Sequence, residues 1–165
     1  MLRDCGASVV LLGHSERRAD HGETSKLVSA KAVQAFSSSL SVMICVGETL
    51  AEREAGNALA TVLDQLAVSL PPTLPTTAMN IAYEPVWAIG TGKVATAAEI
   101  AEMHLGIRGW LDEAGFGQTK ILYGGSVKPG NAAEIFAVPH VDGALVGGAS
   151  LIAADFDDIC AAAAD

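Results

Sequence analysis

The sequence has few basic residues and shows no run of them, which excludes several classes of partner. Its 165 residues contain 10 Lys and Arg against 19 Asp and Glu, a formal net charge of −9. Nucleic acid and anionic membrane surfaces are therefore not expected as partners. An anionic small molecule is still compatible with this charge, because Gly-rich turns and helix N-termini bind phosphate through backbone N–H groups.

Cysteine is also scarce, and other signals of export or cofactor binding are missing. The cysteines are Cys5, Cys45 and Cys160, an odd number without CxxC spacing, which fits a reduced, cytoplasmic protein better than a disulfide scaffold. No signal peptide and no apolar span of about 18 residues stands out. No GxGxxG motif with an acidic residue about twenty positions later is present, so a dinucleotide site is not expected.

The chain does contain a repeated pattern, in which a short apolar run is followed by a helix-like stretch. Each run is nearly continuous in apolar character, as in a parallel strand that is covered on both faces. With 50% apolar residues the chain can form a core, and no linker divides residues 1–165, so one α/β domain with a parallel sheet is predicted. The five runs are Val9–Leu12, Val42–Val46, Ile81–Tyr83, Ile121–Tyr123 and Ala144–Val146.

Three helix starts between these runs can be located from their capping residues. Thr49 with Glu52, and Thr96 with Glu99, have the spacing of capping boxes. Apolar residues with helical periodicity follow both, which predicts amphipathic helices. Asn131, with an acidic residue three positions on, indicates a further and shorter helix.

Glycines and polar residues follow each of the five predicted strands. Because parallel strands end at one edge of the sheet, these residues are expected to gather there, and both α/β barrels and doubly wound sheets bind ligands at that edge. The segments are Gly13–Glu16, Gly47–Glu48, Glu84, Gly124–Ser126 and Gly147–Gly148.

The segment Tyr83–Gly92 is the most informative of these. An apolar run leads to Glu84, Pro85 stops strand pairing, and an apolar stretch then ends in Gly90–Gly92. A carboxylate at the end of a strand, under a mobile apolar lid, suits proton abstraction in a site with little water. Taken alone, the segment fits an exposed Glu in a Pro- and Gly-rich loop equally well.

Taken together, the motifs resemble the triosephosphate isomerase family. The match runs from Met1 nearly to Asp165 and keeps the family's order of motifs. The resemblance implies a TIM-barrel fold and an isomerase of glycolysis and gluconeogenesis. Such an enzyme interconverts dihydroxyacetone phosphate and D-glyceraldehyde 3-phosphate through an enediolate, without a cofactor. The matching segments are Gly13–Arg18, Ile44–Glu48, Tyr83–Gly92, Tyr123–Val127 and Gly143–Ala149.

The resemblance also implies the catalytic residues. Glu84 would be the base that moves a proton between C1 and C2, and His14 would be the imidazole that polarises the carbonyl. Both roles are chemically reasonable, because a fixed donor stabilises the enediolate oxygen and a helix N-terminus favours a neutral imidazole. Glu16 would support the site, although a surface salt bridge with Arg17 or Arg18 is an alternative.

Four further residues would hold the substrate phosphate by resemblance, chiefly through backbone N–H groups. They are Gly90, Ser126, Gly147 and Gly148. Considered alone, the Gly147–Gly148 pair fits a tight turn better. Residues 85–87 and 93–95 would be the hinges of a lid with its tip at 88–92, which closes to exclude water from the intermediate.

The remaining candidates for metal or nucleophilic chemistry are weak. His21, His104 and His140 share no spacing of metal ligands, so solvated or locally bonded side chains and no metal site are expected. Cys45 has no paired base and is expected to pack as a small apolar residue beside the site.

The resemblance covers about five βα units, whereas an α/β barrel has eight in about 250 residues. The family's first three units are not recognisable, so we expect an incomplete barrel and little activity from this chain alone. Two family features that belong to these units are therefore also not recognisable. One is the Asn-x-Lys motif, whose lysine contacts the phosphate in the family, and the other is the loop through which the family's subunits interlock. The homodimer of the full-length family is therefore in doubt here.

Two other readings compete with an isomerase. A non-catalytic phosphate-binding fragment or scaffold module of barrel origin would explain the phosphate turns, but not the retained His14 and Glu84. Another barrel isomerase or an aldolase acting on sugar phosphates is the third reading. An aldolase would need a Schiff-base lysine at a strand end, and no predicted strand end offers one.

Overall fold

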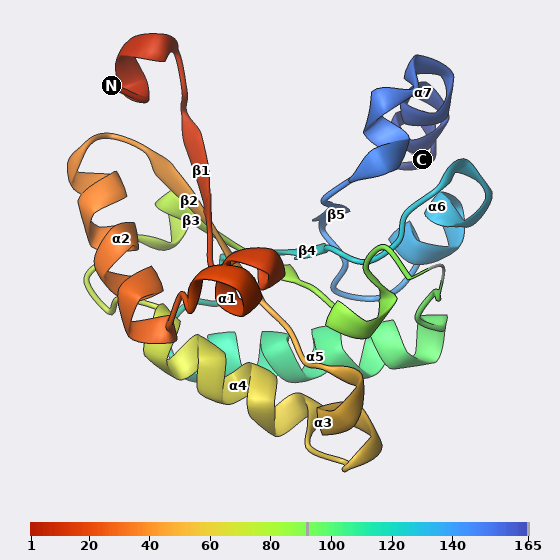
Figure 1. Ribbon diagram of the computed structural model, residues 1–165, viewed down its shortest axis with the longest axis horizontal. Coiled ribbons are helices and arrows are strands. Elements are labelled where there is room, and N and C mark those ends of the chain that lie inside the picture. Colours follow the sequence, from red (N-terminus) through yellow and green to blue (C-terminus); the bar gives the residue numbers. More distant parts are fainter. Residues whose placement is uncertain (92, 165) are drawn as a thin grey trace.

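A parallel five-stranded sheet forms the centre of the protein (Figure 1). The structure, a computed structural model, describes residues 1–91 and 93–164. The strands pair in chain order, all in parallel, which confirms the predicted α/β fold with a parallel sheet. They are β1 (Val9–Leu12), β2 (Ser41–Val46), β3 (Met79–Tyr83), β4 (Lys120–Tyr123) and β5 (Gly143–Ala144).

Each strand overlaps the run that predicted it, with one clear difference at the last. Residues Ala144–Val146 were expected, but β5 is only the two residues Gly143–Ala144. Its partner β4 ends at Tyr123, which pairs with Ala144, so the ladder has no partner for the residues that follow. Leu145 still donates its N–H to the carbonyl of Tyr123.

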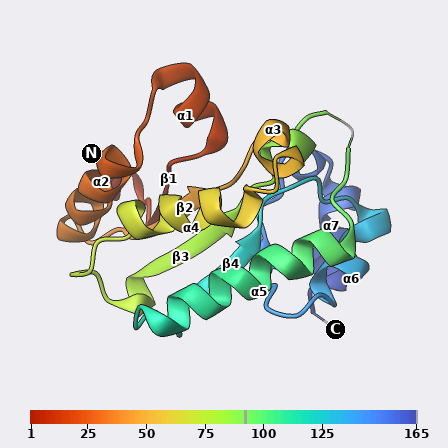
Figure 2. The ribbon, with the colours of Figure 1, turned by 90° about the horizontal axis from the view of Figure 1, so that it is seen from below.

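Helices connect the strands and lie along the outer face of the sheet (Figure 2). The α-helices are α1 (Ser15–His21), α2 (Ser25–Ser37), α3 (Leu50–Glu54), α4 (Ala58–Ser69), α5 (Ala97–Glu113), α6 (Pro129–Phe136) and α7 (Ala153–Ala162). Short 3-10 turns are η1 (Arg3–Cys5), η2 (Thr76–Ala78), η3 (Val86–Ala88) and η4 (Gly148–Leu151). Within the described residues, no helix is long and apolar enough to cross a membrane.

Two of the three predicted helix starts are correct. Thr49 and Thr96 each cap a helix, and Glu52 and Glu99 complete the two capping boxes. The prediction from Asn131 was wrong by one turn, because α6 already begins at Pro129. Proline is preorganised for the first turn of a helix, and the Asn131 side chain instead accepts the N–H of the preceding cap residue.

The two faces of the sheet are packed very differently. The outer face meets the helices in one large apolar cluster, in which Ile44, Ile81 and Ile121 are fully buried. The inner face carries a small cluster, Met43, Cys45 and Ala82. Most of the core therefore lies between the strands and the helices.

The two edge strands lack this protection. Among the described residues, β1 pairs only with β2, and β5 only with β4. On β1, Val9 and Leu11 are 47% and 49% exposed, and beyond β5 Leu151 is 87% exposed.

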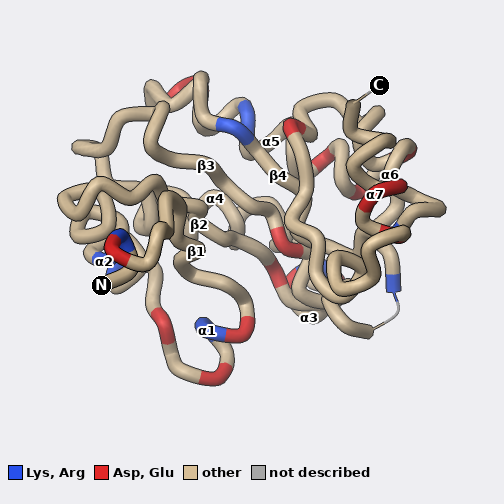
Figure 3. The backbone as a smooth tube through the Cα atoms, turned by 90° about the horizontal axis from the view of Figure 1, so that it is seen from above, with Lys and Arg blue, Asp and Glu red and all other residues tan. Residues whose placement is uncertain are grey.

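Figure 3 shows the basic residues scattered along the chain rather than gathered on one element.

Candidate active site

A cleft of about 600 Å³ lies at the carboxyl ends of the strands. It is lined by segments that follow β1, β3, β4 and β5, which are far apart in sequence but end at the same edge of the sheet. Every site residue predicted from the sequence lines this one cleft: His14, Glu16, Glu84, Gly90, Ser126, Gly147 and Gly148.

Glu84 is placed by the end of β3 and is almost completely buried. Its N–H donates to the carbonyl of Val46 at 2.8 Å, which continues the pairing of β2 and β3 by one residue. One carboxylate oxygen, Oε2, accepts the backbone N–H of Ser15 at 2.9 Å. With the residue only 2% exposed, the alternative of an exposed loop glutamate is wrong.

His14 faces Glu84 from the opposite side, where the chain leaves β1 and enters α1. Its Nε2 lies 3.1 Å from Oε1 of Glu84. Its Nδ1 accepts the backbone N–H of Glu16 at 3.4 Å, as the cap of α1. A nitrogen that accepts a hydrogen bond carries no proton, which leaves Nε2 as the ring nitrogen that can donate to Glu84.

Burial governs the electrostatics of this pair. It raises the pKa of Glu84 above the usual 4.5, and the neighbouring His14 and the Ser15 N–H only partly oppose it. A carboxylate with a raised pKa is a stronger base. Cys45 lies beside it, and burial together with the Glu84 charge raises the pKa of the thiol, which stays protonated and non-nucleophilic.

Two side chains, neither of them predicted as a site residue, fix the loop that carries His14. Glu23 is buried and accepts the N–H of Gly13 at 3.0 Å. Arg18 donates to the carbonyl of Gly13 at 2.7 Å and to that of Cys45 at 3.1 Å. Arg18 thereby ties the loop after β1 to the end of β2. Neither Arg17 nor Arg18 pairs with Glu16, so the salt bridge considered for Glu16 is not found among the described residues.

A second buried carboxylate, Glu48, holds the start of the predicted lid. A single oxygen, Oε1, accepts Trp87 Nε1 at 2.8 Å, Arg53 Nε at 2.9 Å and the Tyr83 hydroxyl at 3.2 Å. Trp87 belongs to η3, at the expected first hinge. The Arg53 guanidinium also lies over the Trp87 ring, 5.4 Å from its centroid. Gly47-Glu48 was recognisable only as a strand end, because the sequence does not show which donors a buried carboxylate will meet.

The other end of the cleft is formed by the glycine-rich turns after β4 and β5. Gly124 and Gly125 leave no space for a side chain, since a Cβ on Gly124 would lie 2.9 Å from Cγ of Glu84. Gly90, Gly147 and Gly148 are exposed and present backbone to the cleft. Gly92 of the predicted lid tip lies outside the described residues. Lys128, to which the sequence assigned no role, also lines the cleft.

Comparison with known proteins identifies the family. The family profile described as triosephosphate isomerase matches residues 1–163. The chain belongs to this family. Triosephosphate isomerases from Ruegeria pomeroyi and from Ruegeria sp. TM1040 are each 59% identical to it, over 98% and 99% of the chain. A crystal structure of the Bartonella henselae enzyme superposes with a TM-score of 0.93 at 43% identity over 99% of the chain.

These comparisons also define how much of a family member is represented. The chain spans 66% of the length of the Ruegeria pomeroyi relative and 68% of the Bartonella henselae structure. The family membership and the TIM-barrel type of fold therefore rest on about two-thirds of a typical member. The matched part contains the predicted acid–base pair and the glycine-rich turns.

Proposed function

We propose that this chain carries the acid–base and phosphate-binding part of an isomerase that interconverts dihydroxyacetone phosphate and D-glyceraldehyde 3-phosphate. The observation that supports it most directly is the 3.1 Å approach of His14 Nε2 to Glu84 Oε1 within one cleft. The two residues are separated by β2 and its helices in the sequence, and only the fold brings them together.

The geometry suits a proton transfer next to a carbonyl. Glu84, with its raised pKa, removes a proton from the carbon beside the carbonyl group and returns it to the neighbouring carbon. Negative charge then develops on oxygen in the enediolate. His14, which carries its proton on Nε2, donates to that oxygen and lowers the barrier.

The glycine-rich end of the cleft suits the phosphate. Gly90, Ser126, Gly147 and Gly148 offer backbone to an anion without side chains that would block its approach. Barrels commonly bind phosphate at the loops after their last two strands, where three of these residues lie. Glu16 lines the same cleft as a supporting residue.

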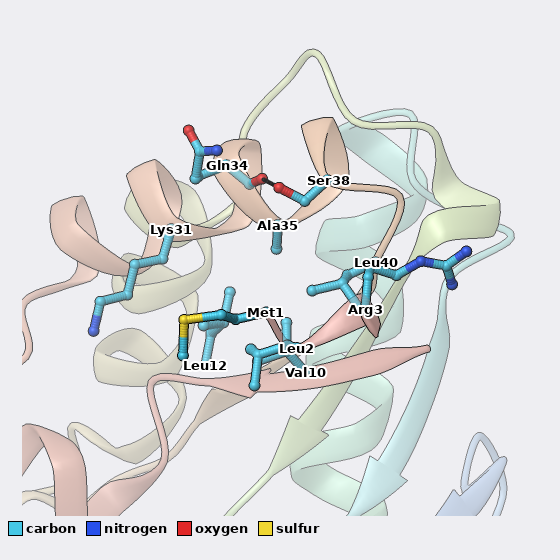
Figure 4. Close-up of a pocket in the computed structure, with 10 residues that line it drawn as sticks. All are labelled: Met1, Leu2, Arg3, Val10, Leu12, Lys31, Gln34, Ala35, Ser38 and Leu40. Atoms are coloured by element: carbon cyan, nitrogen blue, oxygen red, sulfur yellow. Dashed lines mark hydrogen bonds between the residues drawn. The ribbon is translucent and has the colours of Figure 1, made fainter. Parts of the chain in front are cut away.

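The finer fold assignment is part of the same proposal. The five βα units would be the last five of an eight-stranded barrel, and β1 and β5 would be the strands between which three further units fit. Beside β1, an apolar cavity of about 340 Å³ between the N-terminal turn and α2 includes Leu2, Val10 and Leu12 (Figure 4). Such a surface would be covered in a closed barrel.

The finer statements about location and assembly follow from the family. The enzyme would be cytoplasmic and act in glycolysis and gluconeogenesis on a small triose phosphate. Its homodimer is not proposed for this chain alone, because the resemblance does not include the interlocking loop.

The test uses the chain joined to the part of the Ruegeria pomeroyi relative that it does not match, here called the joined barrel. Glu84→Asp should reduce kcat of the joined barrel by about a hundredfold with little change in KM, because the carboxylate retreats by roughly 1 Å. The matched control is Glu113→Asp, a change at an exposed residue of α5. Equal kcat in Glu84→Asp and Glu113→Asp would remove Glu84 from the mechanism.

Two further outcomes separate this function from the non-catalytic alternative. The chain alone should have negligible isomerase activity. In the joined barrel, the acid limb of kcat/KM should lie above pH 4.5, because the pKa of Glu84 is raised and the base must be ionised. A joined barrel that is folded and binds phosphate but shows no turnover would favour a phosphate-binding scaffold instead.

A further inference from the structure

Gln65, in the middle of α4, forms two hydrogen bonds to a single residue at the end of β2. Its Nε2 donates to the carbonyl of Gly47 at 2.8 Å, and its Oε1 accepts the N–H of Gly47 at 3.0 Å. These are the partners that the described part of the chain gives to the backbone of Gly47. A helix side chain thus fixes both polar groups of one loop residue.

Gly47 in turn lies directly against the backbone of Glu84. A Cβ on Gly47 would be 1.8 Å from the carbonyl oxygen of Glu84 and 3.2 Å from its Cβ, so the two main chains are in contact. The residues on either side of Gly47 complete the attachment. Val46 O accepts the N–H of Glu84 at 2.8 Å, and Glu48 O accepts that of Val86 at 3.1 Å.

Because of these contacts, the backbone of Glu84 cannot shift unless Gly47 shifts with it. The carboxylate can point at His14 only if the backbone at residue 84 stays where β2 places it. An error of about 1 Å in the position of a catalytic group is enough to cost about a hundredfold in rate. Gln65 reaches this point from outside the cleft, and it is absent from the residues that line the cleft.

We propose that Gln65 is a positioning residue, which holds Gly47 and through it sets the position of the Glu84 carboxylate. The effect of Gln65 on turnover rests on the proposed function. Its effect on the position of the Glu84 carboxylate does not. Removing the amide leaves the N–H and the carbonyl of Gly47 without partners, so the loop shifts toward water and its contact with Glu84 loosens.

The first measurement is kinetic and compares Gln65→Met with Val62→Ala in the joined barrel. Methionine has a similar volume but makes neither hydrogen bond. Val62 is fully buried one turn earlier in α4 and its side chain cannot hydrogen-bond Gly47, so its truncation destabilises the helix packing while both Gln65 hydrogen bonds remain possible. Gln65→Met should lower kcat about tenfold to a hundredfold with KM within about twofold, and Val62→Ala should leave kcat within about twofold.

The second measurement does not depend on activity. The carboxyl group of Glu84 is titrated by carbon-13 NMR in the chain itself. Gln65→Met should lower the pKa of Glu84 toward its usual value, since a looser loop admits water to the carboxylate, and Val62→Ala should not. A joined barrel without activity would defeat the proposed function, while this titration would still decide the role of Gln65.

Gln65→Lys is the second variant, because its ammonium can still donate to Gly47 O; its losses should be smaller than those of Gln65→Met. The inference fails if Gln65→Met matches the parent in kcat and in the titration of Glu84 while its unfolding midpoint falls like that of Val62→Ala. It also fails if both Gln65 variants are unfolded and Val62→Ala is folded, because Gln65 would then be a structural residue only.

Discussion

The central strands and the edge strands of the sheet differ in how completely they are paired and buried. On β2 and β3, nearly every residue is buried. At their ends, Glu48 accepts three side-chain donors, and Glu84 accepts the Ser15 N–H and lies beside His14. Among the described residues, β1 and β5 pair with a neighbouring strand on one side only, and Gly147 and Gly148, which follow β5, are exposed. Glu84, the proposed base, thus follows a strand whose packing fixes its position, whereas its partner His14 follows the edge strand β1.

The largest expected contrast is in stability. Ile81→Ala on β3 removes a fully buried side chain and should cost about 2–5 kcal/mol of unfolding free energy. Val9→Ala on β1, where the side chain is 47% exposed, should cost less than about 1 kcal/mol. Urea unfolding of the chain, followed by tryptophan fluorescence, measures both. Equal costs would show that the edge strand is as well packed as the centre.

Acid should weaken the region behind the central strands through His104 of α5. This ring is fully buried, its Nδ1 bonds the carbonyl of His140, and burial lowers its pKa to about 4. The unfolded chain takes up this proton near pH 6.5, so stability from the neutral ring is present above that pH and is lost as pH falls toward 4. The loss should be about 3 kcal/mol.

His104→Asn tests this assignment, since asparagine keeps a donor for the carbonyl of His140 but does not titrate. Unfolding free energies measured between pH 7 and pH 4 should fall less steeply in His104→Asn than in the parent. If the two slopes are the same, the acid sensitivity comes from carboxylates elsewhere.

A smaller effect is expected at Trp87, in the predicted hinge. Trp87→Phe removes the indole N–H that donates to the buried Glu48 and should cost about 1.5–3 kcal/mol, the range for hydrogen bonds to charged groups. Circular dichroism during urea unfolding measures it. Because Arg53 and Tyr83 still donate to Glu48, the cost should be at the lower end. A cost near zero would mean that the hinge contact does not contribute to the folded state.

The smallest effect belongs to the open end of the cleft. Lys128→Met removes a cationic side chain that lines the cleft and is exposed. It should raise KM of the joined barrel for a phosphate ester severalfold and leave kcat nearly unchanged, because exposed charges contribute about 1 kcal/mol or less. Added salt should narrow the difference from the parent. A change in kcat rather than in KM would place Lys128 in the chemistry.

The sequence was sufficient for what depends on local pattern. Continuous apolar runs predicted all five strands, and Thr49 and Thr96 predicted their capping boxes. Strand order follows from βα repeats, so the gathering of His14, Glu84 and the glycine turns at one edge could be anticipated as well.

What the sequence could not give is the set of contacts between segments. Gln65 is one amide on a predicted amphipathic helix, and nothing in its neighbours shows that it reaches Gly47. Glu48 is likewise a single carboxylate after a strand until the fold brings Arg53, Tyr83 and Trp87 around it. The bounds of β5 also differ from the predicted run, since its length is decided by where β4 stops offering partners.

The succession of strands along the sheet has a consequence for biosynthesis. Because each strand pairs with the one made just before it, every new βα unit can dock on a neighbour that has already left the ribosome. No pairing among the described strands waits for a distant segment to be translated, which keeps the loop-closure entropy of each step small. Assembly can therefore keep pace with translation, one unit at a time.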